Sequence, residues 1–285
     1  MFPSARKGIY LLCCLAAAIP LFAQAQRPAA PARRQPYYRP RQRAQVQPQP
    51  RQSGGLAVVN AASFLPGVSP GGLATAFGEN LSNVADVVVA NSLPLPTQLA
   101  GVRVMVNGVP AAIYSIAFAN GEDQISFQVP WETDTGPGAV QIDVLNNGFT
   151  VASEVVDSFT EDPGIFTYNG FALAVDWRSG NLIASDNPAG PGDIIILYTT
   201  GNGPVSLNVP DGFAAPGDPL AYTADPFQAL IDGEPAQILF SGLAPGFVGL
   251  YQLNLRLPND LRPGNLDIQI TSPFANSQAA KLPVF

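Results

Sequence analysis

Four short segments occur twice in this sequence, in the same order, and this duplication constrains the fold more than any other feature. VMVNGVPAAIYS (104–115) matches ALIDGEPAQILF (229–240), and QISFQVP (124–130) matches QLNLRLP (252–258). PGAVQIDV (137–144) matches PGNLDIQI (263–270), and SPGGLATAFGENL (69–81) resembles GPGDIIILYTTGNG (190–203). Each copy spans roughly 105 to 115 residues, which is the usual size of one immunoglobulin-like sandwich.

Apolar and polar residues alternate inside both copies, most clearly over 102–107, 124–129, 252–257 and 266–270. A period of two with one buried face predicts antiparallel strands. Turn dipeptides such as Asn107-Gly108, Asn147-Gly148 and Asp232-Gly233 separate the strands, at the spacing expected of sandwiches. No window shows a helical stripe. The pattern therefore predicts an all-β protein with two tandem immunoglobulin-like β-sandwich domains.

The first 54 residues differ from the rest in composition. Residues 1–25 predict a secretory signal peptide: Arg6 and Lys7 precede a fourteen-residue apolar run, and Ala23-Gln24-Ala25 forms a cleavage site. The run is shorter than the roughly 20 residues that span a bilayer, so we expect no transmembrane span in the mature chain. Residues 26–54 contain seven Arg and no acid among Pro, Gln and Ala, which predicts a disordered linker. The linker is either a plain spacer or a cationic arm for anionic surfaces.

The remaining chain divides into three parts. We expect a first sandwich over 55–160, an inter-domain segment over 161–170 and a second sandwich over 171–285. In the inter-domain segment, Ile165 and Phe166 are expected to hold the two domains together.

Several chemistries are excluded by residue type. Both cysteines, Cys13 and Cys14, lie in the predicted signal peptide, and the sequence has no His. A mature chain of this kind has no disulfide, no Cys-ligated zinc and no Ser-His-Asp triad. Residues 55–285 carry five basic residues against all 21 acidic ones, a formal charge of −16, which does not suit nucleic acid. We predict that the protein is not an enzyme and has no catalytic residues.

The acidic residues show no arrangement typical of a site. The neighbouring pairs Glu122-Asp123 and Glu161-Asp162 fit solvated turns better than a glycosidase acid/base pair. Calcium is the one cofactor that such acids could hold, because hard cations take oxygen ligands from loops. The aspartates of the second copy lack ligand spacing, so we expect no cofactor and no metal site; they are Asp186, Asp193, Asp211, Asp218 and Asp225.

Five aromatic residues are candidates for ligand contact. Trp131 and Trp177 follow apolar strands, where a flat ring can stack on a sugar or cover the end of a sandwich. The glycine-rich stretch GLAPGFVG (242–249) is predicted to be a turn, because no Lys, Ser or Thr and no helix follow its glycines as a phosphate-binding loop requires. If a ligand did bind there, Phe247 and Tyr251 would be its apolar wall. Tyr168 completes the set.

Several long motifs resemble a known family. They include VVNAASFLPGVSPGGLATAFGENL, LPLPTQLAGVRVMVNGVPAAIY, DPGIFT and NPAGPGDIIILYTTGNGPV. Together they resemble the Solibacter-type uncharacterised C-terminal domain family of secreted acidobacterial proteins, and the segment 70–81 resembles the start of IPT/TIG domains. The resemblance implies export, IPT/TIG-type β-sandwiches and an envelope or extracellular setting, with no catalytic residues to transfer.

Two functions fit these observations. The first is a secreted, non-catalytic module for adhesion, surface assembly or protein–protein interaction, acting through sheet edges or loop tips. The alternative is an extracellular carbohydrate-binding protein. The expected partner is an envelope protein or a polysaccharide, and the expected location is the exterior, the cell surface or the periplasm. Exposure of Trp131, Trp177 and Tyr168 on one surface would favour sugar binding, and their burial would favour assembly.

Overall fold

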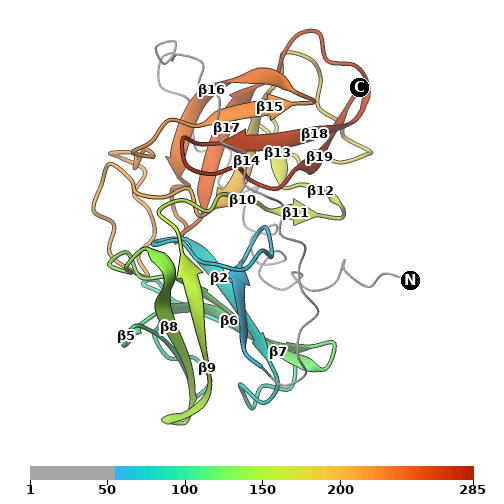
Figure 1. Cartoon of the computed structure of the whole chain (residues 1–285). Coiled ribbons are helices and arrows are strands. Elements are labelled where there is room, and N and C mark those ends of the chain that lie inside the picture. The colour runs from blue at the N-terminus through green and yellow to red at the C-terminus, as the bar shows by residue number, and fades with distance from the viewer. Residues whose placement is uncertain (1–54) are drawn as a thin grey trace.

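The computed structural model describes residues 55–285, and within this range every regular element is a β-strand (Figure 1). The predicted signal peptide (1–25) and the predicted linker (26–54) lie outside the described residues. No helix long and apolar enough to cross a membrane occurs between residues 55 and 285. The chain forms two β-sandwich domains that follow one another along the sequence, as the duplication predicts.

The first domain consists of two antiparallel sheets. One sheet has the strand order β1-β2-β7-β6-β3 and the other the order β5-β4-β8-β9. The strands are β1 Ala57–Asn60, β2 Leu73–Gly78, β3 Val87–Val89, β4 Val102–Val106, β5 Val109–Pro110, β6 Ala112–Ala119, β7 Glu122–Gln128, β8 Gly136–Asn146 and β9 Phe149–Ser158.

The second domain has one continuous path of paired strands, β10-β14-β17-β16-β15-β18-β19, with β13 also paired to β14 and a separate hairpin β11-β12. Its strands are β10 Gly164–Ile165, β11 Thr167–Tyr168, β12 Phe171–Ala172, β13 Ala174–Asp176, β14 Ile194–Thr200, β15 Gln228–Ile231, β16 Glu234–Leu243, β17 Tyr251–Arg256, β18 Gly264–Thr271 and β19 Ala280–Val284. Strand β10 pairs with β14. Part of the segment that was predicted to join the domains therefore belongs to the large sheet of the second domain.

The duplicated segments occupy matching places in the two domains. In the first domain β2 pairs with β7 and β7 with β6; in the second β14 pairs with β17 and β17 with β16. Likewise β4 pairs with β8 and β8 with β9, as β15 pairs with β18 and β18 with β19. The repeated sequence therefore encodes a repeated topology.

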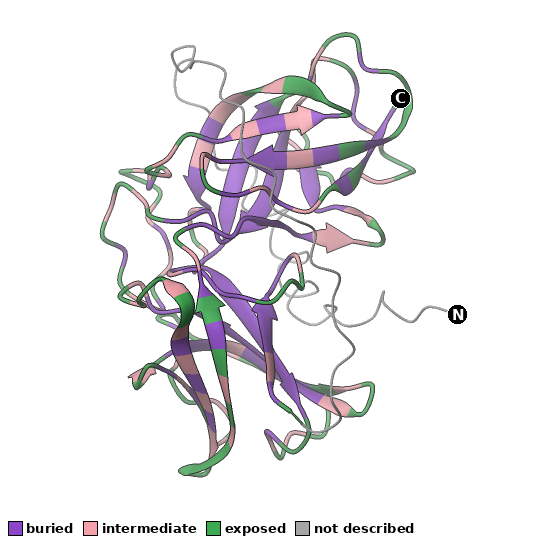
Figure 2. Cartoon of the chain, in the orientation of Figure 1, coloured by how far each residue is buried: buried purple, intermediate pink, exposed green. Residues whose placement is uncertain are grey.

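Each domain has its own apolar core, built from the inward-facing residues of alternating strands. Strand β4 buries Val102, Val104 and Val106, while Arg103 is exposed and Met105 only partly buried. In the second domain, Leu266, Ile268 and Ile270 of β18 are buried in the same way. Figure 2 shows that buried residues make up much of the strands of both domains, while many exposed residues lie at turns and hairpin ends.

Tight turns at the predicted dipeptides connect these strands. Asn107 and Gly108 both have positive φ, of 48° and 81°, and the same holds for Asn147-Gly148 and Asp232-Gly233. Two consecutive residues with positive φ match the type I′ turn, whose twist fits the flanking strands.

Candidate functional site at the domain seam

The two domains are joined by a packed interface, which we call the domain seam. It is formed by side chains and loops from both domains, namely Asn60, Gly71, Leu95, Tyr114, Gln128 and Trp131 of the first and Asp162, Phe166, Thr200, Asp211, Gly212, Val248 and Gly249 of the second. Of the residues that the sequence marks as candidates, Trp131 lies at this seam, and Phe247 lies in the 242–249 loop that contacts the first domain.

An apolar cluster lies at the centre of the seam. Ala61, Ala62 and Leu73 of the first domain are buried in one cluster with Phe166 and Leu250 of the second. Phe166 is fully buried there and touches both domains through this cluster, as predicted. Ile165 lies instead in the core of the second domain.

The glycine-rich loop 242–249 contacts the first domain. The Tyr114 hydroxyl donates a hydrogen bond of 2.7 Å to the Val248 carbonyl and accepts one of 3.0 Å from the Val248 amide. The Thr200 hydroxyl donates to the Gly249 carbonyl (2.9 Å) and accepts from the Leu73 amide (2.8 Å). The loop connects the paired strands β16 and β17, so it is a turn, as predicted. Its hydrogen bonds to Tyr114 also attach the second domain to the first.

A second loop of the second domain, around residue 211, also bonds to the first domain. The Asp211 carboxylate accepts a hydrogen bond of 3.1 Å from the Trp131 amide, and the Gly212 amide donates one of 2.7 Å to the side-chain carbonyl of Gln128. The Gly212 carbonyl accepts a bond of 2.8 Å from Leu95. Burial and, to a smaller extent, the charge of Glu132 raise the pKa of Asp211 to about 6, although the hydrogen bond from the Trp131 amide lowers it.

The five candidate aromatic residues are not gathered on one exposed surface. Trp131 packs against a cluster of the second domain that contains Tyr251, which is itself fully buried. Tyr168 and Phe247 are partly buried against the apolar cluster that reaches the seam, and Trp177 is partly buried against the same cluster beside Ile194, at the end of β14 away from the seam. The Trp131 ring lies so close to Gly71 that a β-carbon there would be 2.3 Å from the ring. These contacts are those of packing residues.

The acidic pairs differ from the expectation of solvated turns. Asp123 is buried, and its carboxylate accepts hydrogen bonds from the Leu81 amide and the Ser82 hydroxyl, so it orders the turn after β2. Glu161 and Asp162 are also buried, at the start of the second domain. The reading as solvated turns was wrong for these three residues, because long-range packing covers them and the local sequence carries no sign of it.

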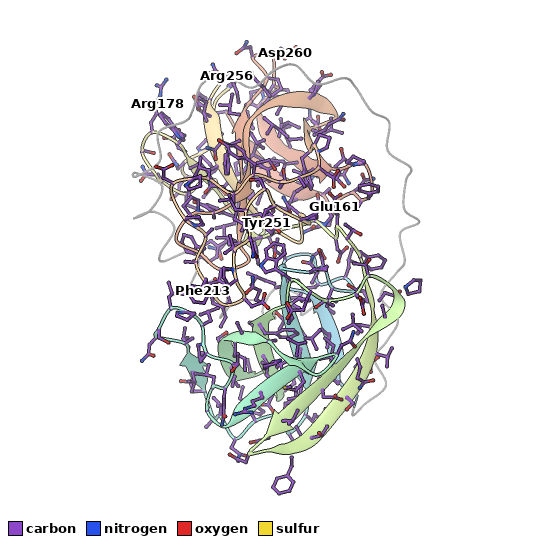
Figure 3. The ribbon with its side chains drawn as sticks, turned by 90° about the vertical axis from the view of Figure 1, so that its left-hand side faces the viewer. Glu161, Arg178, Phe213, Tyr251, Arg256 and Asp260 are labelled. Carbon is purple, nitrogen blue, oxygen red and sulfur yellow. The ribbon has the colours of Figure 1, made fainter. Side chains whose placement is uncertain are left out.

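Glu161 is the most unusual of these acids. Neither carboxylate oxygen makes a hydrogen bond of good geometry, although the Ser272 hydroxyl and the Asp225 carboxyl are close enough to act on it. Burial and, to a smaller extent, the Asp225 charge raise the pKa of Glu161 to about 7, although the Ser272 hydroxyl lowers it. Figure 3 places Glu161 and Tyr251 in the part of the second domain that lies toward the first.

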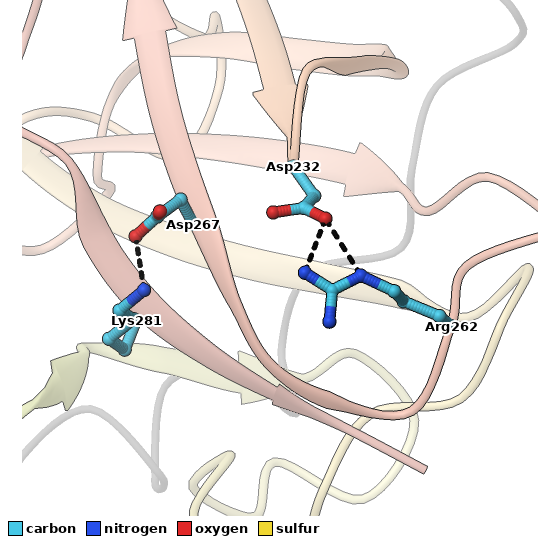
Figure 4. Close-up of polar contacts among 4 residues, drawn as sticks. All are labelled: Asp232, Arg262, Asp267 and Lys281. Carbon is cyan, nitrogen blue, oxygen red and sulfur yellow. Dashed lines mark hydrogen bonds and ion pairs between the residues drawn. The ribbon is translucent and has the colours of Figure 1, made fainter.

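The outer surfaces carry weak ion pairs and some exposed apolar residues. Arg262 bonds to Asp232 at 3.0 and 2.7 Å, and Lys281 lies 2.7 Å from Asp267 (Figure 4). These pairs are exposed and worth little individually. Strand β9 is an edge strand whose Phe149, at 77%, is the most exposed large apolar residue between positions 55 and 285.

No protein-family model and no curated protein matches the sequence. Among solved structures, the chain is similar to the mixed-linkage glucan utilization protein SGBP-B of Bacteroides ovatus, with 11% identity over 76% of this chain and 43% of that one (TM-score 0.28). It is similar to the tandem Ig repeats of Dlar, with 10% identity over 82% of this chain and 99% of that one (TM-score 0.21). It is also similar to the Escherichia coli adhesin FdeC, with 15% identity over 82% and 65% (TM-score 0.22).

The chain spans less than half the length of the first of these structures. With TM-scores this low, the class rests on the strand order described above: the molecule is a tandem immunoglobulin-like β-sandwich protein. The resemblance of its motifs to the Solibacter-type family stays a prediction.

Proposed function

We propose that this chain is an exported, non-catalytic binding module for adhesion or surface assembly, and that it binds a protein partner through the β8–β9 hairpin. The hairpin extends from the first domain, away from the second (Figure 1). Its location outside the cytoplasm follows from the predicted signal peptide. The two domains joined by the seam then serve as a scaffold that holds the hairpin outward.

The observation that carries the proposal is the exposed apolar surface of β9. Phe149, Val151 and Val155 are 77%, 44% and 56% exposed, and β9 has no strand beyond it in its sheet. Edge strands of this length present unpaired backbone groups and are a common route for protein binding. Val151 has no residue opposite it on β8, so a bulge interrupts the edge. This bulge disfavours long strand addition and leaves side-chain contact at the hairpin end as the mode of binding.

Carbohydrate binding is the alternative, and it has less support. Sugar recognition of the expected kind requires exposed flat rings, and Trp131 and Trp177 are both half-buried against apolar clusters. Burial of these rings was expected to favour assembly over sugar binding, so their packing supports the assembly function.

The experiment compares the exported chain with two matched variants in binding to envelope fractions and to a glycan array. One variant changes the hairpin (Phe149→Ser with Val155→Thr), and the other changes exposed residues of the second domain (Phe274→Ser with Phe285→Ser). We expect saturable protein binding that falls at least about tenfold in the hairpin variant alone. Equal binding by all three chains, or binding to a defined sugar instead, would contradict the proposal.

A further inference from the structure

Strand β3 is an open edge of the five-stranded sheet in the first domain. It pairs with β6, and no strand between residues 55 and 285 pairs with its other side. The Phe118 amide donates to the Asp86 carbonyl, so the ladder is hydrogen-bonded at position 86. Because hydrogen-bonded pairs alternate along an antiparallel ladder, the N–H and C=O groups of Val87 and Val89 point away from β6. The edge therefore offers backbone groups to a further strand.

The side chains at this edge are apolar, and the domain around it is acidic. Val87 and Val89 are 36% and 38% exposed, whereas proteins usually protect an edge with charged side chains, Pro or a covering segment. Asp86, directly before the strand, is also exposed. Residues 55–160 contain nine acidic residues and a single basic one, Arg103, whose side chain bonds to Gln98. A basic segment with one apolar face would complement this edge.

The chain enters the first domain at the same end of the same sheet. Ala57, the first residue of β1, lies in one register row with Val87, and the row passes through β2, β7 and β6. Since β1 and β3 are the two edges of a five-stranded sheet, about 19 Å separate them. Residues 48–54 can span about 23 Å when extended. The part of the chain that precedes residue 48 can therefore reach β3.

One stretch of this preceding chain has the sequence of a strand that would fit the edge. Residues 41–47, RQRAQVQ, lie between two prolines and form the longest run without Pro between positions 26 and 50. Every residue in the run can donate its N–H to a ladder, which Pro cannot do. Alternate side chains of an extended segment point to opposite faces, so Ala44 and Val46 share one face and Arg41 and Arg43 the other.

We propose that residues 41–47 add to the edge of β3 as a further strand, so that a basic segment of this chain covers the acidic domain that follows it. With its apolar face beside the two valines of β3, the segment has its arginines on the same face of the sheet as Asp86. Strand addition derives its affinity from main-chain hydrogen bonds. The tether gives an effective concentration in the millimolar range, so a short ladder is sufficient. The inference does not depend on the proposed function, because the β8–β9 hairpin belongs to the other sheet.

Amide hydrogen exchange of residues 26–285, followed by NMR, tests the proposal because strand addition would protect the amides of Val87 and Val89. The variant is Ala44→Pro combined with Gln45→Pro. Successive N–H groups of a strand point in opposite directions, so one of the two that are lost faces β3. We expect exchange at the two valines to become at least about tenfold faster in this variant. Both substitutions lie outside the two domains, so the fold should be unchanged.

Ala29→Pro combined with Ala30→Pro is the matched control, since it places two prolines in the same arm but outside the proposed strand. It should keep the protection of the unaltered chain. Equal exchange at Val87 and Val89 in all three chains would overturn the proposal and leave the arm as a spacer or a ligand of other surfaces. Protection that decreases on dilution would also overturn it, because a second copy of the chain would then cover β3.

Discussion

Tyr114 in the first domain both donates to and accepts from the backbone of Val248 in the second, at 2.7 and 3.0 Å. One hydroxyl thus satisfies the carbonyl and the amide of a residue 134 positions further along the chain. The bonded residue lies in the glycine-rich loop that follows β16. Loops that look like ligand-binding elements in the sequence therefore fasten the two sandwiches to each other.

Removal of this hydroxyl should weaken the seam. Tyr114→Phe keeps the ring but leaves two groups of Val248 without a partner, so we expect a loss of about 2 kcal/mol in the free energy of unfolding. Chemical denaturation measures this loss. Tyr222→Phe, which changes an exposed ring on the second domain, is the control and should stay within about 0.5 kcal/mol. Equal effects of the two substitutions would mean that the seam bond contributes nothing.

The contact between Trp131 and Gly71 should tolerate no side chain. Gly71→Ala would place a β-carbon 2.3 Å from the ring, whereas Gly108→Ala would meet nothing within 4 Å. Both glycines have positive φ, of 71° and 81°, so the backbone cost of roughly 1 to 2 kcal/mol is common to both. We expect Gly71→Ala to be more destabilising by a further ~2 kcal/mol and to change the tryptophan fluorescence. Similar stabilities and spectra for the two variants would contradict the observed ring position.

Phe166 should be the costliest side chain to truncate at the seam. It is fully buried in the apolar cluster shared by the domains, so Phe166→Ala should cost about 3 to 5 kcal/mol. Phe274→Ala, at a ring that is 69% exposed, should change the stability by less than about 0.5 kcal/mol. Urea denaturation of both variants gives the comparison. A small effect at Phe166 would show that the cluster is not the centre of the seam.

Asp211 should make stability depend on pH. Burial raises the pKa of this carboxyl from its usual value near 3.8 to about 6 in the folded protein. The folded state therefore holds the proton more tightly than the unfolded state, and the stabilisation is fully present below about pH 4 and lost as the pH rises through 6. Because the group is partly exposed, we expect a change of only about 1 kcal/mol.

Asp211→Asn provides the measurement, since the amide stays neutral and can still accept the bond from Trp131. Its free energy of unfolding, measured from pH 4 to pH 7, should fall less steeply than that of the unaltered chain. Glu132→Gln should have a partial effect, because the Glu132 charge contributes to the raised pKa. Parallel pH profiles for the unaltered chain and Asp211→Asn would rule out the linkage.

The strands could be predicted from the sequence because their determinants are local. Alternation in 102–107 gives β4, and the Asn107-Gly108 turn fixes where it ends. The duplicated motifs of the two copies could be aligned with each other from the sequence alone. The strands that they form pair in the same way in the two domains. Phe166 could be assigned to the seam because it lies between the two copies.

The seam chemistry could not be predicted, because it depends on contacts between residues far apart in the sequence. Glu161-Asp162 has the composition of a surface turn, yet both residues are buried. Trp131 follows a strand in a way that fits an exposed ring, but a loop more than 70 residues later packs on it. Gly203 approaches the Glu161 side chain closely, but the sequence alone does not connect these two residues.

Differential scanning calorimetry of residues 26–285 tests the central claim most directly, namely that the seam joins the two sandwiches into one cooperative unit. We predict a single transition whose calorimetric and van't Hoff enthalpies agree, with an enthalpy near 160 kcal/mol at about 60 °C for residues 55–285. Two resolved transitions, each with roughly half of that enthalpy and with only one of them shifted by Phe166→Ala, would contradict it.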